Sequence, residues 1–179
     1  MRFRPEDDQI VVDLETFSCR PNAVIVSIGA VKFSLTEGIK EEFFVNLDPK
    51  TSFDLGLHVS PDTINWWKMQ SKEAIESWSL NPVPVRDGML SFLNFYGPDR
   101  NTPIWGNGSS FDVSILESTI HALEFPNLRN KAPWNYWDIY CMKTLTNILG
   151  HRLEKTGVNH NALHDAQAEA KLIIKMLQS

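Results

Sequence analysis

Cysteine is scarce in this sequence of 179 residues, which holds only Cys19 and Cys141. Two cysteines cannot form a disulfide framework, and the absence of a C-x-x-C pair argues against a zinc ribbon. No stretch approaches the roughly 18 apolar residues that cross a bilayer, and the amino-terminal segment lacks the apolar run of a signal peptide. We therefore expect a soluble, cytoplasmic protein with free thiols and no membrane partner.

An excess of positive charge is also missing, since 17 Lys and Arg residues stand against 22 Asp and Glu residues, for a formal net charge of −5. This balance excludes a polycation that coats nucleic acid by charge alone. It does not exclude a nuclease, because four carboxylates that hold divalent cations would account for most of the negative charge. Basic residues such as Arg20, Lys68 and Lys72 are scattered, which is typical of a solvated surface.

The order of the predicted elements favours one α/β domain. The first half predicts three strands joined by short turns, as in an antiparallel meander, followed by three helices. The second half predicts a strand, a loop and three further helices, the last of which buries one stripe of small and apolar residues. The predicted strands are 9–14, 23–33, 42–47 and 103–105, and the predicted helices are 63–70, 71–78, 85–96, 111–123, 137–149 and 162–177.

A pair of carboxylates lies on the first predicted strand, where Asp13 and Glu15 are two positions apart. Because strand side chains alternate between faces, both acids point the same way, and a bound cation or protons would relieve their repulsion. Two solvated acids at a strand edge are the other interpretation.

A third acid, Asp112, follows a glycine-bearing loop at 106–110 and begins a predicted helix. Gly106 and Gly108 permit a positive φ or the close approach of a ligand, which suits a site at the end of a strand. Asp112 also interacts favourably with a helix dipole, and either role or both fits.

The segment 160–165 holds a further group of titratable residues. His160 and Asp165 would point about 140° apart on an ideal helix, so we expect His160 on the preceding loop. His164 lacks a glutamate partner, because Asn161 takes its place in the H-E-x-x-H pattern, and we interpret it as a supporting or surface residue. A hydrolase zinc site formed by His160, His164 and Asp165 is the competing interpretation.

Together these segments resemble, over essentially the whole chain, the DEDDh 3′–5′ exonucleases of the ribonuclease H-like superfamily. Further similarity, in the segment 13–31 and in the pair Trp66-Trp67, is to the phage and prophage branch, which includes mycobacterial exoribonucleases. The resemblance rests on three ordered motifs: Asp13-Leu-Glu15-Thr, Asp112 after a Trp-Gly-Asn-Gly loop, and His160 followed five positions later by Asp165.

The resemblance implies a single exonuclease domain over 1–179 with a ribonuclease H-like fold, in which helices flank a mixed sheet of an antiparallel meander plus parallel strands. It also implies two Mg²⁺ or Mn²⁺ ions held by Asp13, Glu15, Asp112 and Asp165. His160 would take the proton of the attacking water, a role that the ordinary histidine pKa near 6.5 suits. The expected product is a nucleoside 5′-monophosphate released from a 3′ end.

The expected substrate contacts surround the first strand. Neighbouring residues on a helix face apart, so we expect one of Trp66 and Trp67 near the cleft and the other in the core, with Trp67 favoured for the core. An exposed aromatic ring would stack on a base. By resemblance alone, the backbone of Leu14 and Thr16 and the side chains of Phe17 and Asn107 line the pocket for the terminal nucleotide.

The leading hypothesis is a metal-dependent exonuclease acting on single-stranded 3′ ends, with DNA modestly preferred to RNA because the phage-like branch indicates DNA processing. An exoribonuclease of the same mechanism is the alternative, since nothing in the sequence identifies a contact to a 2′-OH. A noncatalytic nucleic-acid-binding module is the third hypothesis. The sequence leaves a homodimer open.

Overall fold

A five-stranded mixed sheet forms the centre of the computed structural model, which describes residues 4–108, 110–125, 132–153 and 157–178. The strand order is β3-β2-β1-β4-β5. β1 pairs antiparallel with β2 and parallel with β4, β2 pairs antiparallel with β3, and β4 pairs parallel with β5. The strands are β1 (Gln9–Thr16), β2 (Ile25–Ser34), β3 (Gly38–Asn46), β4 (Ile104–Gly106) and β5 (Ile139–Cys141). The predicted meander and mixed sheet are therefore confirmed.

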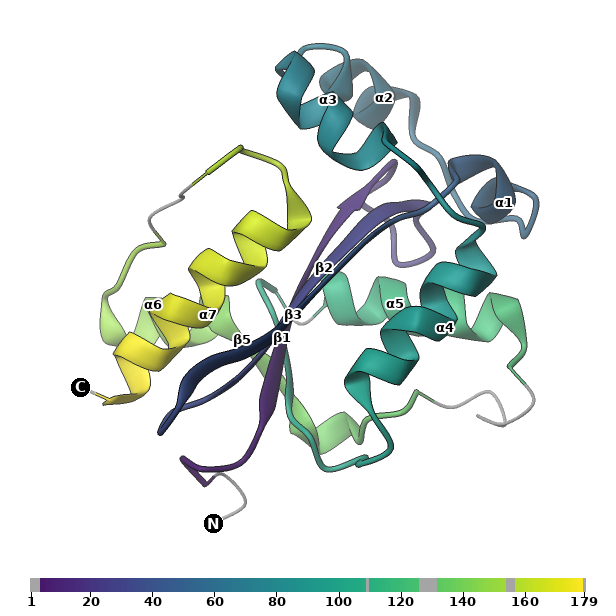
Figure 1. Ribbon diagram of the computed structural model, residues 1–179. Helices are drawn as coiled ribbons and strands as arrows, with labels where there is room; N and C mark the ends of the chain where they lie inside the picture. Colours follow the sequence, from purple (N-terminus) through teal and green to yellow (C-terminus); the bar gives the residue numbers. More distant parts are fainter. Residues whose placement is uncertain (1–3, 109, 126–131, 154–156, 179) are drawn as a thin grey trace.

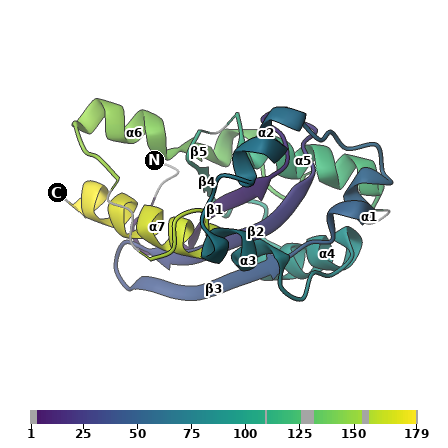
Figure 2. The same cartoon turned by 90° about the horizontal axis from the view of Figure 1, so that it is seen from above.

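Helices cover both faces of this sheet and one of its ends (Figures 1 and 2). α4 and α5 pack on one face, and α6 and α7 pack on the other. α2 and α3 lie beyond the end of β1, at the top of Figure 1. The helices are α1 (Pro49–Phe53), α2 (Pro61–Trp67), α3 (Lys72–Ser79), α4 (Val85–Tyr96), α5 (Asp112–Leu123), α6 (Met142–Leu149) and α7 (Ala162–Gln178).

Side chains of β1 divide the hydrophobic core into two layers, because successive residues of a strand point to opposite faces. Ile10, Val12 and Leu14 belong to the layer beneath α4 and α5. Val11 belongs to the opposite layer, beneath α6 and α7. The two acids of β1 follow Val11 at intervals of two residues, so the strand directs both toward the α7 side of the sheet.

The segment 137–149 differs from the single helix that the sequence predicts. Tyr136–Asp138 forms a 3₁₀ turn and Ile139–Cys141 forms β5, so only Met142–Leu149 is α-helical. β5 pairs with β4 along its whole length. A pairing with a strand more than thirty residues earlier therefore overrides the local helical pattern, as tertiary context often does.

The remaining helices agree closely with the predicted ranges, except that α1 was not predicted. α1 begins after Asp48, whose side chain accepts a hydrogen bond from the Lys50 backbone N–H. In α7, the predicted stripe is buried from Ala162 to Ile173, and Leu177 packs at its end. The loop predicted at 106–110 includes Ser109, which lies outside the described residues.

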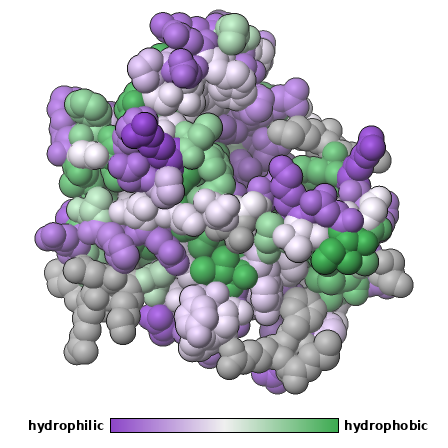
Figure 3. Space-filling view, turned by 180° about the vertical axis from the view of Figure 1, so that it is seen from behind, coloured by the Kyte–Doolittle hydropathy of each residue, from purple (hydrophilic) through white to green (hydrophobic). Residues whose placement is uncertain are grey.

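The surface carries apolar side chains in separate groups on the face that Figure 3 shows, which is the view from behind.

Cys19 and Cys141 are both free, the first exposed and the second half-buried. Across the described ranges, none of the helices has the length and apolar character needed to cross a bilayer.

Candidate active site

The site forms where β1 ends beneath the first turns of α7. Asp13 lies opposite Gly29 of β2 in the antiparallel ladder. A β-carbon at Gly29 would overlap the backbone of Ala162, the first residue of α7. The missing side chain therefore lets α7 begin directly against the sheet beside Asp13, as glycine does where two backbones approach closely.

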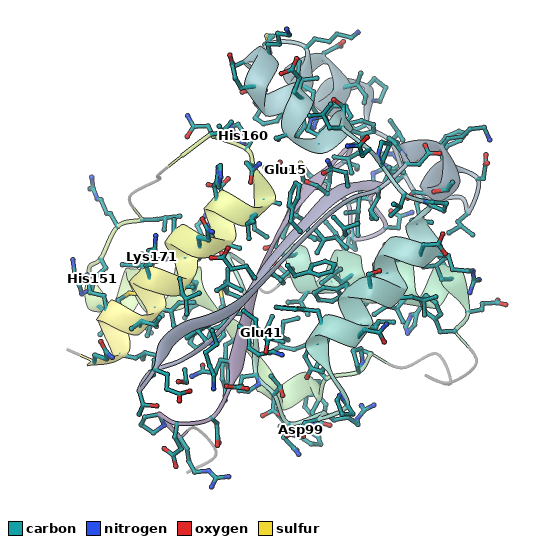
Figure 4. All side chains as sticks on the ribbon, viewed as in Figure 1. Glu15, Glu41, Asp99, His151, His160 and Lys171 are labelled. Atoms are coloured by element: carbon teal, nitrogen blue, oxygen red, sulfur yellow. The ribbon has the colours of Figure 1, made fainter. Side chains whose placement is uncertain are left out.

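This close approach brings a histidine and two carboxylates together, and Figure 4 shows two of the three, Glu15 and His160, beside the start of α7. Glu15 of β1, His160 and Asp165 of α7 each offer one ligand atom, and these three atoms lie within 4.8 Å of one another. Glu15 and Asp165 are buried, while His160 is half-buried. Glu15 is far from His160 and Asp165 in the sequence, so the fold brings it to them.

His160 lies on the loop before α7, as the sequence predicts. Its backbone has a φ of +60°, in the left-handed region that residues other than glycine rarely adopt. The Ser77 hydroxyl donates a hydrogen bond to the His160 carbonyl oxygen at 3.2 Å. The imidazole packs edge-on against the Trp66 ring, with centroids 4.8 Å apart. Contacts from α2 and α3 therefore hold His160 in a backbone conformation that costs roughly 1–3 kcal/mol.

Asp112 begins α5 and reaches the end of β1 from the other side. Its Oδ1 accepts a hydrogen bond from the Leu14 backbone N–H at 3.3 Å. A β-carbon at Gly106 would lie 3.1 Å from its Oδ2, so glycine at that position leaves room for the carboxylate. Burial raises the pKa of the Asp112 carboxyl to about 7, although hydrogen bonds from backbone N–H groups oppose the shift.

Asp13 experiences the combined negative charge of the site. Desolvation is the main cause that raises the pKa of its carboxyl well above the usual range, and repulsion by Glu169, Asp112, Glu15 and Asp165 adds to it. Glu169 is the carboxylate that sequence reasoning missed. It lies one helical turn after Asp165 in α7 and is 1% exposed. Its helical spacing of four from Asp165 was the available signal.

The donor set fits hard divalent cations. Carboxylate oxygens are the ligands that Mg²⁺ and Mn²⁺ prefer. Bound cations would also offset the repulsion between the crowded carboxylates. His164, which the zinc interpretation requires, is absent from the group of ligand atoms found among the described residues. Its Nδ1 instead accepts a hydrogen bond from the Val158 backbone N–H at 3.2 Å.

A pocket of about 390 Å³ adjoins these carboxylates. Trp67 is 3% exposed, and its Nε1 donates to the Thr16 carbonyl oxygen at 2.9 Å, whereas Trp66 is 37% exposed. Trp67 is therefore the buried member of the pair and Trp66 the exposed one, and both line the pocket. The lining residues are Leu14, Glu15, Thr16, Cys19, Asp62, Thr63, Trp66, Trp67 and Phe111.

Comparison with known proteins decides the family. The family model described as the 3′–5′ exoribonuclease Rv2179c-like domain matches residues 8–177. The chain belongs to this family. The resemblance to DEDDh exonucleases that the three motifs indicate is thereby confirmed.

Individual relatives share little sequence identity with this chain. An exodeoxyribonuclease of Enterobacteria phage T4 is 28% identical over 127 residues, which cover 64% of this chain and 56% of the phage protein. Exonuclease I of E. coli, solved with a dA16 oligonucleotide, has a TM-score of 0.64 at 14% identity, covering 97% of this chain and 41% of that chain. The chain thus spans about half the length of these relatives.

A smaller solved structure matches the fold over nearly its full length. The nuclease domain of 3′hExo, a DEDDh family member bound to rAMP, has a TM-score of 0.55 at 14% identity, covering 96% of this chain and 92% of that chain. The predicted ribonuclease H-like fold is confirmed. None of these comparisons bears on the homodimer that the sequence leaves open.

In this Rv2179c-like chain, two residues expected at the substrate are not among those that line the pocket. Phe17 packs edge-on against Trp78, with ring centroids 5.2 Å apart, in a separate apolar cluster. Asn107 has an exposed side chain in the loop before α5, and its backbone N–H donates a hydrogen bond to the Asp112 carboxylate. Asp62 and Thr63 line the pocket without having been predicted, because only the packing of α2 over β1 brings them there.

Proposed function

We propose that this chain is a metal-dependent 3′–5′ exonuclease that releases nucleoside 5′-monophosphates from the 3′ ends of single-stranded nucleic acid. The observation that carries the proposal is the convergence of Glu15, His160 and Asp165 within 4.8 Å, beside Asp13 and Asp112. Membership of the Rv2179c-like family supports the same reaction class.

The proposed cofactor is a pair of Mg²⁺ or Mn²⁺ ions held by four carboxylates. These belong to Asp13, Glu15, Asp112 and Asp165, which approach from β1, α5 and α7. Bound cations would supply Lewis-acid stabilisation of the charge that develops on the phosphate and the leaving 3′ oxygen. The protein contributes fixed carboxylates, and burial followed by mutual repulsion raises the pKa of Asp13. Binding of positive charge would offset both effects.

His160 is the proposed general base. Its ring nitrogen lies within reach of the Glu15 and Asp165 oxygens, and the Trp66 ring limits its rotation. The imidazole accepts the proton of the attacking water while the bond between phosphorus and the 3′ oxygen breaks. The phosphate therefore stays on the 5′ carbon of the released nucleotide.

The apolar pocket next to the carboxylates is the proposed place of the terminal base. Trp66 is half-exposed in its wall, and Leu14 and Thr16 form its floor along β1. Stacking of a base on an aromatic ring contributes about 1–3 kcal/mol without depending on the base identity. This arrangement supports a nuclease of low sequence specificity.

DNA remains the first substrate that we propose, and the phage relative named an exodeoxyribonuclease supports it. RNA is the second candidate, because the matching family is described as an exoribonuclease. The sugars of the two differ by the 2′-OH, so a contact at that group lets a protein distinguish them.

The test uses 20-nucleotide single strands of matched DNA and RNA sequence, labelled at the 5′ end. With Mg²⁺ we expect progressive shortening from the 3′ end, release of nucleoside 5′-monophosphates, and arrest by a chelator. Comparison of the two rates decides between DNA and RNA. Shortening from the 5′ end, release of 3′-monophosphates, or full activity with chelator would each reject the proposal.

A further inference from the structure

Basic residues are distributed unevenly in this acidic protein. Residues 142–179 hold five of the 17 Lys and Arg residues but only three of the 22 acids, namely Glu154, Asp165 and Glu169. Asp165 and Glu169 are both buried in the site. The surface of α6 and α7 is therefore basic wherever the structure describes it, although the sequence pattern had indicated only scattered charges.

These basic residues line a groove of about 470 Å³ between α7 and the loop that follows α6. We call it the basic groove. Ala168 and Leu172 are buried and form its apolar floor. Its lining consists of Gly150, His151, Arg152, Ala168, Lys171, Leu172 and Lys175.

The basic side chains of the groove are available to a ligand. Arg152, Lys171 and Lys175 are exposed. Within the described part of the chain, none of the three takes part in an ion pair, whereas Lys32, Lys40, Lys50 and Lys72 each pair with an acid elsewhere on the surface. Exposed cations that border an apolar floor favour binding of an anion that also buries some apolar surface.

The groove lies along α7, the helix whose first turns carry Asp165. His164, Ala168, Lys171 and Lys175 follow one another at intervals of four, three and four residues, which places them in one stripe along the helix. The stripe begins at the turn that carries Asp165 and extends for about 16 Å. Figure 4 shows Glu15 and His160 at one end of α7, with Lys171 and His151 farther along it.

We propose that the basic groove binds backbone phosphates of the substrate strand on the 5′ side of the cleaved end. This inference rests on the proposed function, which supplies the occupant. The part of α7 that lines the groove, from Ala168 to Lys175, extends for about 10 Å. A stacked strand carries one phosphate per about 3.4 Å, so this length accommodates roughly three phosphates. The position of the groove on α7, the helix that also carries Asp165, favours this strand over an acidic polypeptide.

The test compares a double variant, Lys171→Gln with Lys175→Gln, against a charge-matched control, Lys50→Gln with Lys143→Gln. Lys50 and Lys143 are exposed and lie outside the groove. Binding of a labelled 20-nucleotide strand and of a trinucleotide is measured by fluorescence anisotropy with chelator present, followed by KM and kcat with Mg²⁺.

We expect the groove variant to bind the 20-nucleotide strand about tenfold more weakly, with the trinucleotide and kcat unchanged. The slope of log Kd against log salt should fall by about 1.4, since each lost phosphate contact removes about 0.7 for a single strand. The control double variant should bind both strands like the wild type.

Three results would overturn the inference. The first is equal weakening of the long and short strands in the groove variant, and the second is equal weakening in the control variant. The third is unchanged strand binding by the groove variant together with lost binding of a polyglutamate peptide, measured in the same anisotropy assay. The binding assay does not require turnover. A wild-type protein inactive on every strand would therefore reject the proposed function, while anisotropy would still decide the groove.

Discussion

His160 combines a strained backbone with a ring that contacts the proposed ligands. The φ of +60° is tolerated by asparagine better than by most residues. We therefore predict that His160→Asn keeps the fold but lowers kcat by about 10²–10⁴, the usual effect of losing a general base. Single-turnover kinetics with Mg²⁺, and circular dichroism for the fold, provide the measurement.

The matched control for this prediction is His121→Asn, because His121 is exposed on α5 and belongs to no described ligand group. The control should retain wild-type kcat. If His160→Asn also turned over at the wild-type rate, another residue would have to accept the proton.

Glu169 adds a fifth negative charge to the site without belonging to the four expected ligands. Because it repels Asp13, we predict that Glu169→Gln raises the thermal stability of the metal-free protein. The same loss of charge should weaken Mn²⁺ binding by about tenfold, at the low end of the effects seen for residues that surround metal ligands. Calorimetric Mn²⁺ titration and thermal unfolding with chelator measure the two effects.

Glu124→Gln supplies the control, since Glu124 is an exposed acid at the end of α5. It removes the same charge at a distance from Asp13, so Mn²⁺ affinity should stay at the wild-type value. Unchanged Mn²⁺ affinity in Glu169→Gln would show that its charge does not reach the metals.

At the scale of elements, the contact between β2 and α7 determines where the catalytic residues lie. A methyl group at Gly29 would overlap the Ala162 backbone, so α7 would have to move away from Asp13. We predict that Gly29→Ala lowers the free energy of unfolding by about 1–3 kcal/mol and reduces both Mn²⁺ affinity and kcat. Urea unfolding, metal titration and kinetics test this.

Gly38→Ala separates stability from positioning. Gly38 has a φ of +79°, and a β-carbon at this position would meet nothing within 4 Å, so alanine there strains the backbone without a clash. It should cost roughly 1–2 kcal/mol of stability while leaving Mn²⁺ affinity intact. Wild-type Mn²⁺ affinity in Gly29→Ala would contradict the positioning role.

Local patterns predict those elements whose structure depends on their own residues. The alternation in β1 placed Asp13 and Glu15 on one face, and the stripe of α7 identified its buried side. The predicted helix was wrong at β5, because three residues carry too little pattern and pairing with β4 decides their structure. Glu169 was missed because its proximity to Asp13 depends on how α7 crosses the sheet.

At the scale of the whole molecule, the charge is separated into an acidic centre and a basic flank. The carboxylates converge at the end of β1, and the basic groove follows α7 away from them. With bound divalent cations, both regions would attract a polyanion. A protein with a net charge of −5 can therefore bind nucleic acid along one path while repelling it elsewhere.

The acidic centre also predicts how stability depends on pH. The pKa of Asp112 is raised from 3.8 to about 7, so between these values the folded protein binds more protons than the unfolded chain. The free energy of unfolding of the metal-free protein should therefore fall as pH rises from 4 to 8, and the Asp112 carboxyl should contribute about 1–4 kcal/mol to this fall. Mg²⁺ should restore more stability at pH 8 than at pH 5.

Urea unfolding measures both trends, and Asp13→Asn with Asp112→Asn should flatten them. Stability that rises with pH over this window, in the wild type but not in that variant, would mean that the buried carboxylates are not destabilised by their own charge.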